Sequence, residues 1–223
     1  MLPGAGPYTG VADGRILKYV NPSVGFVDYG VTSPNRSKAL CVGYSIPALG
    51  PTCGRPLGLG FNNLTGDLYI ADAYLGLLVL RKNQTIATQL ATSANGGLSG
   101  PAGTAVSPDG TFVLVTEFIG KRIQKYWLKG PKANTAEVLI TFKGRPDNIK
   151  RNRGGDFWVA VNQETIIPLL MKPEGIRLDA NGTVKESRPI NLQYGTTLVS
   201  EVQEFSGALY IGSMYTNFIG VYK

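Results

Sequence analysis

The chain contains no histidine, although it is 223 residues long. Histidine is the side chain whose ordinary pKa lies closest to neutrality, and many enzymes use it as general base or as metal ligand. Its absence excludes Ser-His-Asp and Cys-His nucleophilic sites, and it also excludes metal sites built on imidazole.

Long apolar runs and a strong bias in charge are also absent. No run approaches the roughly 20 apolar residues of a membrane-spanning helix, and the N-terminus shows no apolar signal-peptide core. Charged residues make up 17% of the chain, and the Lys and Arg residues behind its net charge of +7 are mostly spread singly. The densest basic cluster, Lys143 to Arg153, is predicted to be a solvated loop. We therefore expect neither a membrane span nor a nucleic-acid partner.

Cysteine is scarce, with only two residues in the chain. Cys41 and Cys53 enclose an 11-residue segment rich in glycine and proline. This spacing suits a disulfide, which requires an oxidising compartment, and it also suits a pair of free thiols in a cytosolic chain. The spacing alone leaves both interpretations open.

Four N-glycosylation sequons stand in turn-like positions, at Asn35, Asn63, Asn83 and Asn181. A single sequon often arises by chance, but four sequons together with the cysteine pair favour the secretory route. On that interpretation, we expect the natural start of the protein to lie upstream of this one.

What the chain does contain is a repeat. Four segments begin with glycine and continue as short apolar runs, and they start at Gly66, Gly110, Gly155 and Gly207, with spacings of 44, 45 and 52 residues. A repeat of about 40–50 residues with several short strands is typical of a β-propeller. The 29 glycines and 14 prolines suit a chain with many turns. The sequence therefore predicts an all-β propeller.

The strands of these repeats can be placed by their flanking turns. A hairpin is predicted over 8–20, turning at Asp13-Gly14, whereas 21–56 is turn-rich and 163–173 is either a loop or a short helix. The other predicted strands are 57–61, 67–72, 76–81, 85–91, 102–107, 111–116, 121–128, 137–142, 147–150, 157–162, 174–179, 183–190, 198–204, 209–213 and 218–223.

Several longer motifs resemble the plant strictosidine synthase-like family. They are the segments 6–15, 53–58, 68–74, 107–118, 125–132, 147–152 and 200–213, which together run nearly from end to end. The resemblance implies a six-bladed propeller related to the paraoxonases, with a small-molecule ligand at one end of the central channel. It also implies that Cys41 and Cys53 form the family's disulfide, and that the protein enters the endomembrane system and reaches the vacuole or the cell exterior.

The chain departs from this family in its length. In the family, the counterpart of 88–95 is followed by more than one further blade before the counterpart of 100–107, whereas here the two are almost joined. The family's beginning, upstream of Gly6, is missing as well. We therefore predict one propeller domain over 1–223 with an internal deletion near 95–100. At about 45 residues per blade, such a domain has roughly four to five blades.

The chain also departs at the catalytic positions. The family is named for a Pictet–Spengler condensation of an amine with an aldehyde in alkaloid biosynthesis, which uses a Glu as general acid–base with a His nearby. Ser200 stands at the Glu position and Leu198 at the His position. A serine hydroxyl does not shuttle protons near neutral pH. The adjacent Glu201 substitutes only if the strand slips by one residue, and otherwise it is a solvent-facing or blade-interface carboxylate.

The resemblance also suggests a calcium-dependent reaction as an alternative to condensation. Asp147-Asn148 matches the adjacent Asp-Asn calcium ligands of the paraoxonase-like members, but calcium needs six to eight oxygens, and Ala102 replaces a further Asn ligand. Asp147 and Asn148 also suit a turn that caps the strand with side-chain hydrogen bonds. We expect no required cofactor and only a residual calcium-type pair.

Two functions remain open. One is an enzyme, either a condensing lyase or a calcium-dependent ester or lactone hydrolase, and Ser200 and Leu198 count against condensation. The other is a non-catalytic secreted or vacuolar glycoprotein that binds a small ligand or a partner at the channel mouth. The aromatic residues Tyr74, Phe118 and Tyr215 are candidates to line such a pocket, and core packing is their alternative role.

Overall fold

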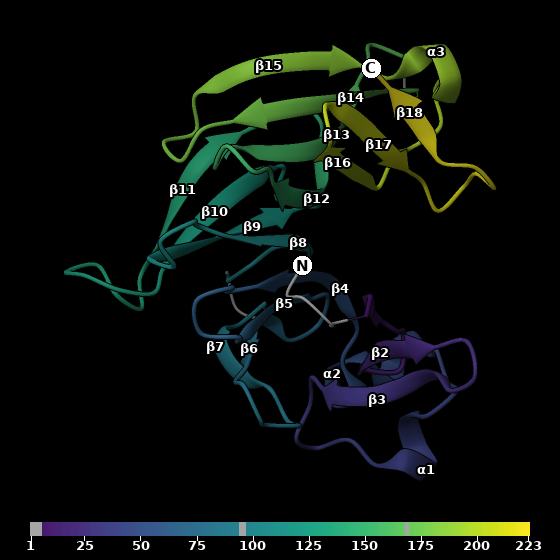
Figure 1. Cartoon of the computed structure of the whole chain (residues 1–223), viewed down its shortest axis with the longest axis vertical. Helices are drawn as coiled ribbons and strands as arrows, with labels where there is room; N and C mark the ends of the chain where they lie inside the picture. The colour runs from purple at the N-terminus through teal and green to yellow at the C-terminus, as the bar shows by residue number, and fades with distance from the viewer. Residues whose placement is uncertain (1–5, 94–96, 168–169) are drawn as a thin grey trace. The chain divides into compact units, whose positions relative to one another are not determined.

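The computed structural model describes residues 6–93, 97–167 and 170–223. The chain divides into two compact units, Met1–Pro101 and Ala102–Lys223, which are described separately below as unit 1 and unit 2. Figure 1 shows how the strands of each unit follow one another along the chain.

Unit 1 contains two antiparallel sheets and the segment that carries the cysteines. The first sheet has three strands in chain order, β1 (Tyr8–Gly10), β2 (Arg15–Asn21) and β3 (Gly25–Val31). Three short helices follow, namely α1 (Lys38–Cys41), the 3-10 helix η1 (Pro47–Leu49) and α2 (Gly50–Cys53). The second sheet has four strands in chain order, β4 (Pro56–Phe61), β5 (Leu68–Asp72), β6 (Gly76–Leu80) and β7 (Thr88–Ala91).

Apolar side chains of both sheets form the core of unit 1. Ile16 of β2 is buried with Leu68 and Ile70 of β5 and with Leu78 and Leu80 of β6. A parallel bridge between Val31 and Ile86 adds backbone hydrogen bonds between the end of β3 and the segment before β7. The two sheets of unit 1 are therefore joined by packing and by backbone pairing.

Unit 2 contains three antiparallel sheets, each with its strands in chain order. The first holds β8 (Pro101–Val106), β9 (Phe112–Glu117), β10 (Arg122–Trp127) and β11 (Ala136–Thr141). The second holds β12 (Arg145–Arg151), β13 (Phe157–Glu164), β14 (Met171–Leu178) and β15 (Val184–Pro189). After α3 (Asn191–Tyr194), the third holds β16 (Glu201–Phe205), β17 (Ala208–Gly212) and β18 (Gly220–Tyr222).

Two apolar clusters fill the spaces between these sheets. Phe157 and Val159 of β13 face the first sheet, where Phe112 and Leu114 of β9 are buried with them. The alternate residues of β13, including Trp158, face the third sheet and pack in the second cluster. Because successive residues of a strand point to opposite faces, β13 can be apolar on both sides and serve both cores.

The predicted repeat corresponds to one hairpin in each of four sheets. Gly66, Gly110, Gly155 and Gly207 all have positive φ, between 64° and 94°, and each lies in the turn before the second strand of its sheet. Glycine adopts this conformation without the steric cost that other residues carry. The repeat therefore marks the entry to β5, β9, β13 and β17.

The five sheets confirm the all-β prediction and have the form of propeller blades, at the upper end of the predicted four to five. The predicted hairpin over 8–20 forms as β1 and β2. The described helices have at most four residues, so none of them could cross a lipid bilayer.

Some local predictions were wrong. The turn-rich region 21–56 contains the strand β3, and much of the predicted loop Lys143–Arg153 is the strand β12. The strand predicted over 147–150 lies within β12 and is confirmed. Within 163–173, β13 ends at Glu164 and β14 begins at Met171, whereas residues 168–169 lie outside the described residues. The predicted deletion near 95–100 also falls partly outside them, because 94–96 are not described.

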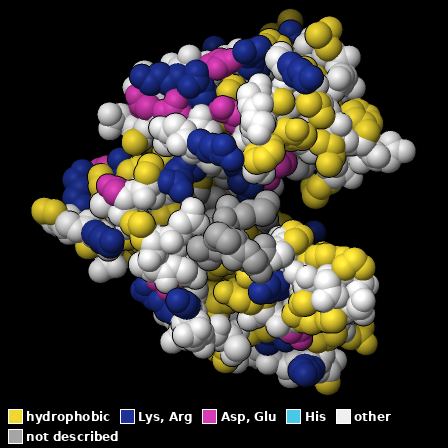
Figure 2. All heavy atoms as spheres, viewed as in Figure 1, with side chains coloured by type: hydrophobic (Ala, Val, Ile, Leu, Met, Phe, Trp, Pro, Cys, Tyr) yellow, Lys and Arg dark blue, Asp and Glu magenta, His cyan; other side chains and the backbone are white. Residues whose placement is uncertain are grey.

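Basic side chains are scattered over the surface. Figure 2 shows Lys and Arg over much of the viewed face, with Asp and Glu among them. Within the predicted basic cluster, Arg145 lies 3.3 Å from Glu164, and Lys150 lies 3.3 Å from Glu201. These two cations are therefore paired with carboxylates of the same unit.

Candidate functional site

The predicted site residues of unit 2 lie on its first strands. Asp147 and Asn148 belong to β12, Ser200 directly precedes β16, and Ala102 lies in β8. The strand β12 packs against β16. The structure therefore brings the Asp-Asn pair next to the segment with Leu198 and Ser200, for which the resemblance predicted the family's catalytic positions.

A β-bulge sets the direction of the Asp-Asn pair. In the register between β12 and β13, Pro146 is opposite Val161 and Ile149 is opposite Val159, so the two residues between them interrupt the regular pairing. Bulges of this kind bend a strand and re-aim its side chains, and they are frequent beside active sites. Pro146 and Ile149 are buried, whereas Asp147 and Asn148 are half-buried.

Backbone contacts fix the neighbours of this bulge. The amide N–H of Asn148 donates to the carbonyl oxygen of Ser200 at 3.0 Å, and the N–H of Ser200 donates to the carbonyl of Gly212 at 2.8 Å. A Cβ atom at Gly103 would lie 2.7 Å from the Cα of Asn148. Glycine is therefore needed at position 103, because β8 passes so close to the bulge.

Two carboxylates interact at this point. Burial, and secondly the charge of Glu201, raise the pKa of Asp147 to about 7, although the backbone N–H of Asn148 opposes the shift. Glu201 places one carboxylate oxygen 3.3 Å from Nζ of Lys150. Its other oxygen, Oε1, is buried without a hydrogen bond in the described part of the chain. The pair thus holds more negative charge than its one lysine compensates, and a proton on Asp147 relieves the excess.

Glu201 has the blade-interface position that was one of its two predicted alternatives. Its partner Lys150 lies on β12 of the second sheet, whereas Glu201 opens β16 of the third sheet. The strand β16 begins at Glu201, and Ser200 lies just before it. The rule that successive residues of a strand point to opposite faces therefore does not apply to these two side chains. No slip of register is needed to bring the carboxylate of Glu201 close to Asp147.

Asn162 holds this segment in place, although no motif in the sequence indicated it. Asn162 of β13 is fully buried, and its side chain donates to the carbonyl of Val199 at 3.0 Å and accepts from the N–H of Val199 at 2.9 Å. In the sequence, Asn162 directly follows the apolar run Phe157–Val161. A polar residue in this position could have indicated a buried side chain with hydrogen-bond partners. Asn162 is therefore a positioning residue for Leu198, Ser200 and Glu201.

The donor set at Asp147-Asn148 does not fit a calcium ion. Asp147, Asn148 and Glu201 carry side-chain oxygens, whereas Ala102 supplies none and Lys150 brings a positive charge to Glu201. Calcium takes six to eight oxygens. No group of three or more acidic, Cys or His side chains suited to a metal occurs among the described residues.

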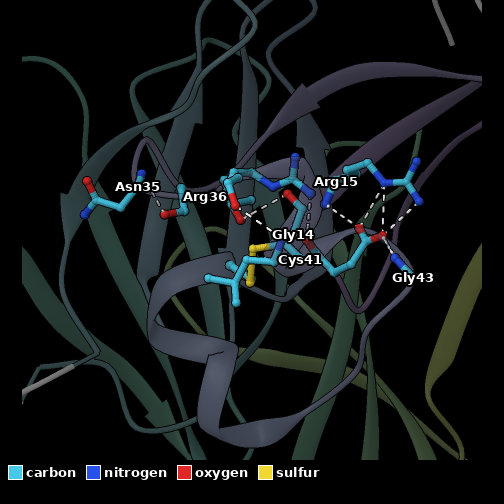
Figure 3. The surroundings of a disulfide bond; sticks show 12 residues. Gly14, Arg15, Asn35, Arg36, Cys41 and Gly43 are labelled. Carbon is cyan, nitrogen blue, oxygen red and sulfur yellow. Dashed lines mark hydrogen bonds and ion pairs between the residues drawn. A yellow bond between two sulfur atoms is a disulfide. The ribbon is translucent and has the colours of Figure 1, made fainter.

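In unit 1 the two cysteines form a disulfide. Cys41 and Cys53 are buried, with their Cα atoms 5.6 Å apart. Figure 3 shows Arg15 and Gly43 in the surroundings of this bond. The carboxylate of Asp13 accepts from Nε of Arg15 and from the N–H of Gly43, each at 3.0 Å. Burial acts to raise the pKa of Asp13, but the hydrogen bonds from Arg15 and Gly43 outweigh it and lower that pKa. An ionised Asp13 therefore holds the loop inside the disulfide.

The four sequons share one structural setting. Each asparagine lies in a turn and is exposed to solvent, so its side chain is accessible to modification; these residues are Asn35, Asn63, Asn83 and Asn181.

The three aromatic candidates lie in different surroundings. The ring of Tyr74 packs against Gly50 of the disulfide loop in unit 1. In unit 2, Phe118 lies under the guanidinium of Arg145 at 5.5 Å, and Tyr215 is 64% exposed. Tyr74 and Phe118 are half-buried, and neither belongs to the apolar clusters described above.

Comparison with known proteins identifies the family. The family model described as strictosidine synthase matches residues 61–131. The chain is 36% identical to Protein STRICTOSIDINE SYNTHASE-LIKE 12 of Arabidopsis thaliana, across 99% of the chain and 83% of that relative. The chain belongs to the strictosidine synthase-like family. It is also 31% identical to the strictosidine synthase of Catharanthus roseus, across 97% of the chain and 79% of that enzyme.

Among solved structures, the fold is similar to that of a gluconolactonase from Xanthomonas campestris. The TM-score is 0.61 at 14% identity, across 92% of the chain and 64% of that structure. At this identity the similarity concerns the fold alone. The alignment to the Arabidopsis relative extends over 282 residues, more than the 223 of this chain, so that relative has residues within the aligned region that are absent here.

Proposed function

We propose that the chain hydrolyses an ester or a lactone, with Asp147 as general base, and that it lacks the amine–aldehyde condensation for which its family is named. The observation that carries this proposal is the position of Asp147 on the bulge of β12, beside Ser200 and Glu201. Burial and the charge of Glu201 raise the pKa of Asp147 to about 7, where general acid–base catalysis at neutral pH is efficient. Ser200 and Leu198 supply no equivalent group at the condensing positions.

The reaction needs only the substrate and water. Ionised Asp147 accepts a proton from a water molecule as the water oxygen attacks the carbonyl carbon of the substrate. When the tetrahedral intermediate collapses, the carbon–oxygen bond to the alcohol breaks, and Asp147 returns the proton to the leaving oxygen. Glu201 acts indirectly, because its charge helps to hold the pKa of Asp147 near neutrality.

The first experiment is a hydrolysis screen with purified protein whose disulfide is intact. A panel of aryl esters and lactones is tested with and without a chelator, and we expect turnover that the chelator leaves unchanged. Asp147→Asn should lower the rate by about 10²–10⁴-fold, the contribution of a general base. Glu164→Gln, which changes an exposed carboxylate of β13, is the matched control. Unchanged hydrolysis in Asp147→Asn would contradict the proposal.

The role of Glu201 gives a separate readout. Glu201→Gln removes the like charge beside Asp147, so the pH at which the hydrolysis rate is half-maximal should move below its wild-type value near 7. A loss of rate without a shift of this midpoint would indicate a merely structural role for Glu201.

The absence of condensation is tested by restoring the family's residues. We expect no product from an amine and an aldehyde with the wild-type chain. The double substitution Leu198→His with Ser200→Glu places both missing groups on the segment that Asn162 holds. Condensation by the wild-type chain would overturn this part of the proposal.

A non-catalytic glycoprotein of the secretory route is the second candidate. The buried Cys41–Cys53 disulfide and the four exposed sequons support that route, with the vacuole or the cell exterior as destination. If the screen finds no hydrolysis, saturable stabilisation by a small ligand would favour this function. Mass spectrometry of protein isolated from its source tests the occupancy of the sequons.

We also propose that the chain is a single propeller domain shortened by an internal deletion near 95–100. The alignment to the Arabidopsis relative, which is longer than this chain, supports the deletion. A transcript that encodes an extra segment at this point would identify the longer form.

A further inference from the structure

Unit 1 contains a pocket of about 770 Å³ that the functions above do not use. Its walls are the segment 32–35 after β3, Pro51 of α2, and parts of 75–89 around β6 and β7. The volume lies within the range of about 300–1,000 Å³ that small-molecule sites occupy. All of these residues belong to unit 1, so the pocket is a property of that unit alone.

The chemistry of the lining is uniform in one respect, because none of the fourteen residues carries a charge. Eight of them have a hydroxyl or an amide side chain, and the others are apolar. Hydroxyls and amides both donate and accept hydrogen bonds. Such a lining suits a ligand that is neutral and rich in hydroxyl groups, whereas an ion would find no opposite charge to compensate its desolvation.

Five of these eight polar side chains are available for hydrogen bonds to a ligand. The side chains of Asn35, Asn83, Gln84, Thr85 and Thr88 make no hydrogen bond to another described residue, and all five are exposed. They can therefore bond to a ligand without breaking a bond inside the protein.

The wall opposite β6 and β7 is held by local contacts. The hydroxyl of Thr32 donates to the carbonyl of Gly14 at 3.3 Å, and the hydroxyl oxygen of Ser33 accepts from the N–H of Asn35 at 3.2 Å. Figure 3 shows Asn35 and Arg36 on the segment that leads to Cys41 and the disulfide. The wall is thus positioned before any ligand arrives, which reduces the entropic cost of binding.

Two of the four sequons lie at this pocket, since Asn35 and Asn83 line it from its two sides. We propose that the pocket binds an uncharged carbohydrate. The sugar has two sources with the same chemistry, the chain's own N-linked glycan on Asn35 or Asn83, or a free neutral saccharide. The inference does not rest on the hydrolytic function proposed for unit 2.

The first arm of the test uses the chain's own glycans. Protein secreted from a glycosylating host is analysed by mass spectrometry, and its melting temperature is measured before and after enzymatic removal of the glycans. Asn35→Asp and Asn83→Asp are compared with the control substitutions Asn63→Asp and Asn181→Asp, whose sequons do not line the pocket. Asp is chosen because Asn83 has a φ of 67°, which Asp tolerates better than most residues.

The second arm uses a free sugar. Glycan-free protein is titrated with N,N′-diacetylchitobiose, and ligand-induced stabilisation is recorded. Thr88→Trp places a large side chain in the pocket, and Thr141→Trp is the control on an exposed strand of unit 2. Thr88 belongs to no sequon, so this variant leaves glycosylation unchanged.

The outcomes separate the two sources. If the pocket holds the chain's own glycan, losing the Asn35 or Asn83 glycan lowers the melting temperature by about 2–4 °C, and the control sequons have no such effect. If it takes a free saccharide, the sequon variants melt like the wild type, and chitobiose stabilises Thr141→Trp but not Thr88→Trp. Equal effects at all four sequons, with no stabilisation by chitobiose, would overturn the proposal.

Discussion

The two units of this chain are stabilised in different ways. Unit 1 relies on a disulfide and on short helices around an apolar core between two sheets. Unit 2 lacks a cysteine, and its three sheets are joined by two apolar clusters and by buried polar contacts such as those of Asn162. The carboxylates with potential for catalysis lie in unit 2, whereas the pocket without charges lies in unit 1.

This difference shows that similar antiparallel sheets can form an uncharged pocket in unit 1 and can hold interacting carboxylates in unit 2. A covalent bond that constrains a loop leaves the side chains of that loop available to line a surface, as Pro51 does. In unit 2 the first strands themselves supply Asp147 and Glu201, so the site depends on how closely its sheets pack. Stability and chemistry are therefore more tightly linked in unit 2 than in unit 1.

The largest effect is expected from the core of unit 2. Phe157→Ala removes a fully buried ring that packs between two sheets, and it should lower the free energy of unfolding by about 3–5 kcal/mol. Phe205→Ala is the control, because that ring is 53% exposed and its loss should cost less than about 1 kcal/mol. Urea denaturation measures the free energy of unfolding of both variants. Equal losses would contradict the role of the buried cluster around Phe157 in stabilising unit 2.

The next effect concerns the disulfide of unit 1. Removing it in the Cys41→Ala, Cys53→Ala double variant should cost about 3 kcal/mol, because the unfolded chain gains conformational freedom. Hydrogen exchange should increase in the helices between the two cysteines, with the strands β13 and β14 as internal reference. Treatment of the wild type with a reductant should reproduce this pattern, and unchanged exchange in the loop would contradict the comparison.

A smaller effect is expected from the polar contact behind the site. Asn162→Ala leaves the N–H and the carbonyl of Val199 without partners in a buried position, at a cost of about 1–3 kcal/mol. Hydrolytic activity should fall as well, because the segment with Ser200 and Glu201 loses its support. Gln163→Ala, which removes a single half-buried contact to Glu174, is the matched control for both measurements.

The last effect depends on pH. The pKa of Asp147 is raised from 3.8 to about 7 in the folded protein, so the folded state binds this proton more tightly than the unfolded state. The resulting stability is fully present below about pH 4 and is lost as the pH rises through 7. Asp147→Asn should therefore melt above the wild type at pH 8 and together with it at pH 4. Thermal melts of both proteins from pH 4 to pH 8 measure this difference in melting temperature. A wild type that melts above Asp147→Asn at pH 8 would contradict the prediction.

Much of the fold was predictable because glycine is the residue that most readily adopts a positive φ and therefore marks turns. Gly66, Gly110, Gly155 and Gly207 each mark a turn with positive φ, and their spacing indicated the blades before any strand was placed. The strand β3 was missed because Pro22, Gly25 and Gly30 gave its region the composition of a loop. That strand forms because β2 and the backbone near Ile86 pair with it, which no local pattern reveals.

The site was predictable only in part. The resemblance indicated Asp147, Asn148 and Ser200, and the structure brings these residues together. The influence of Glu201 on Asp147 depends on a bulge and on packing between β12 and β16, and neither can be derived from spacing along one strand. Lys150 was counted among surface charges, because its partner Glu201 is distant in sequence.

The most direct test of the account is the pKa of Asp147, measured by carboxyl ¹³C NMR in the wild type and in Glu201→Gln. We expect a value of about 7 in the wild type and a clearly lower one in the variant, since the like charge is removed. A wild-type value near the ordinary 3.8, or the same raised value in both proteins, would contradict the claim that burial and the charge of Glu201 raise the pKa of Asp147.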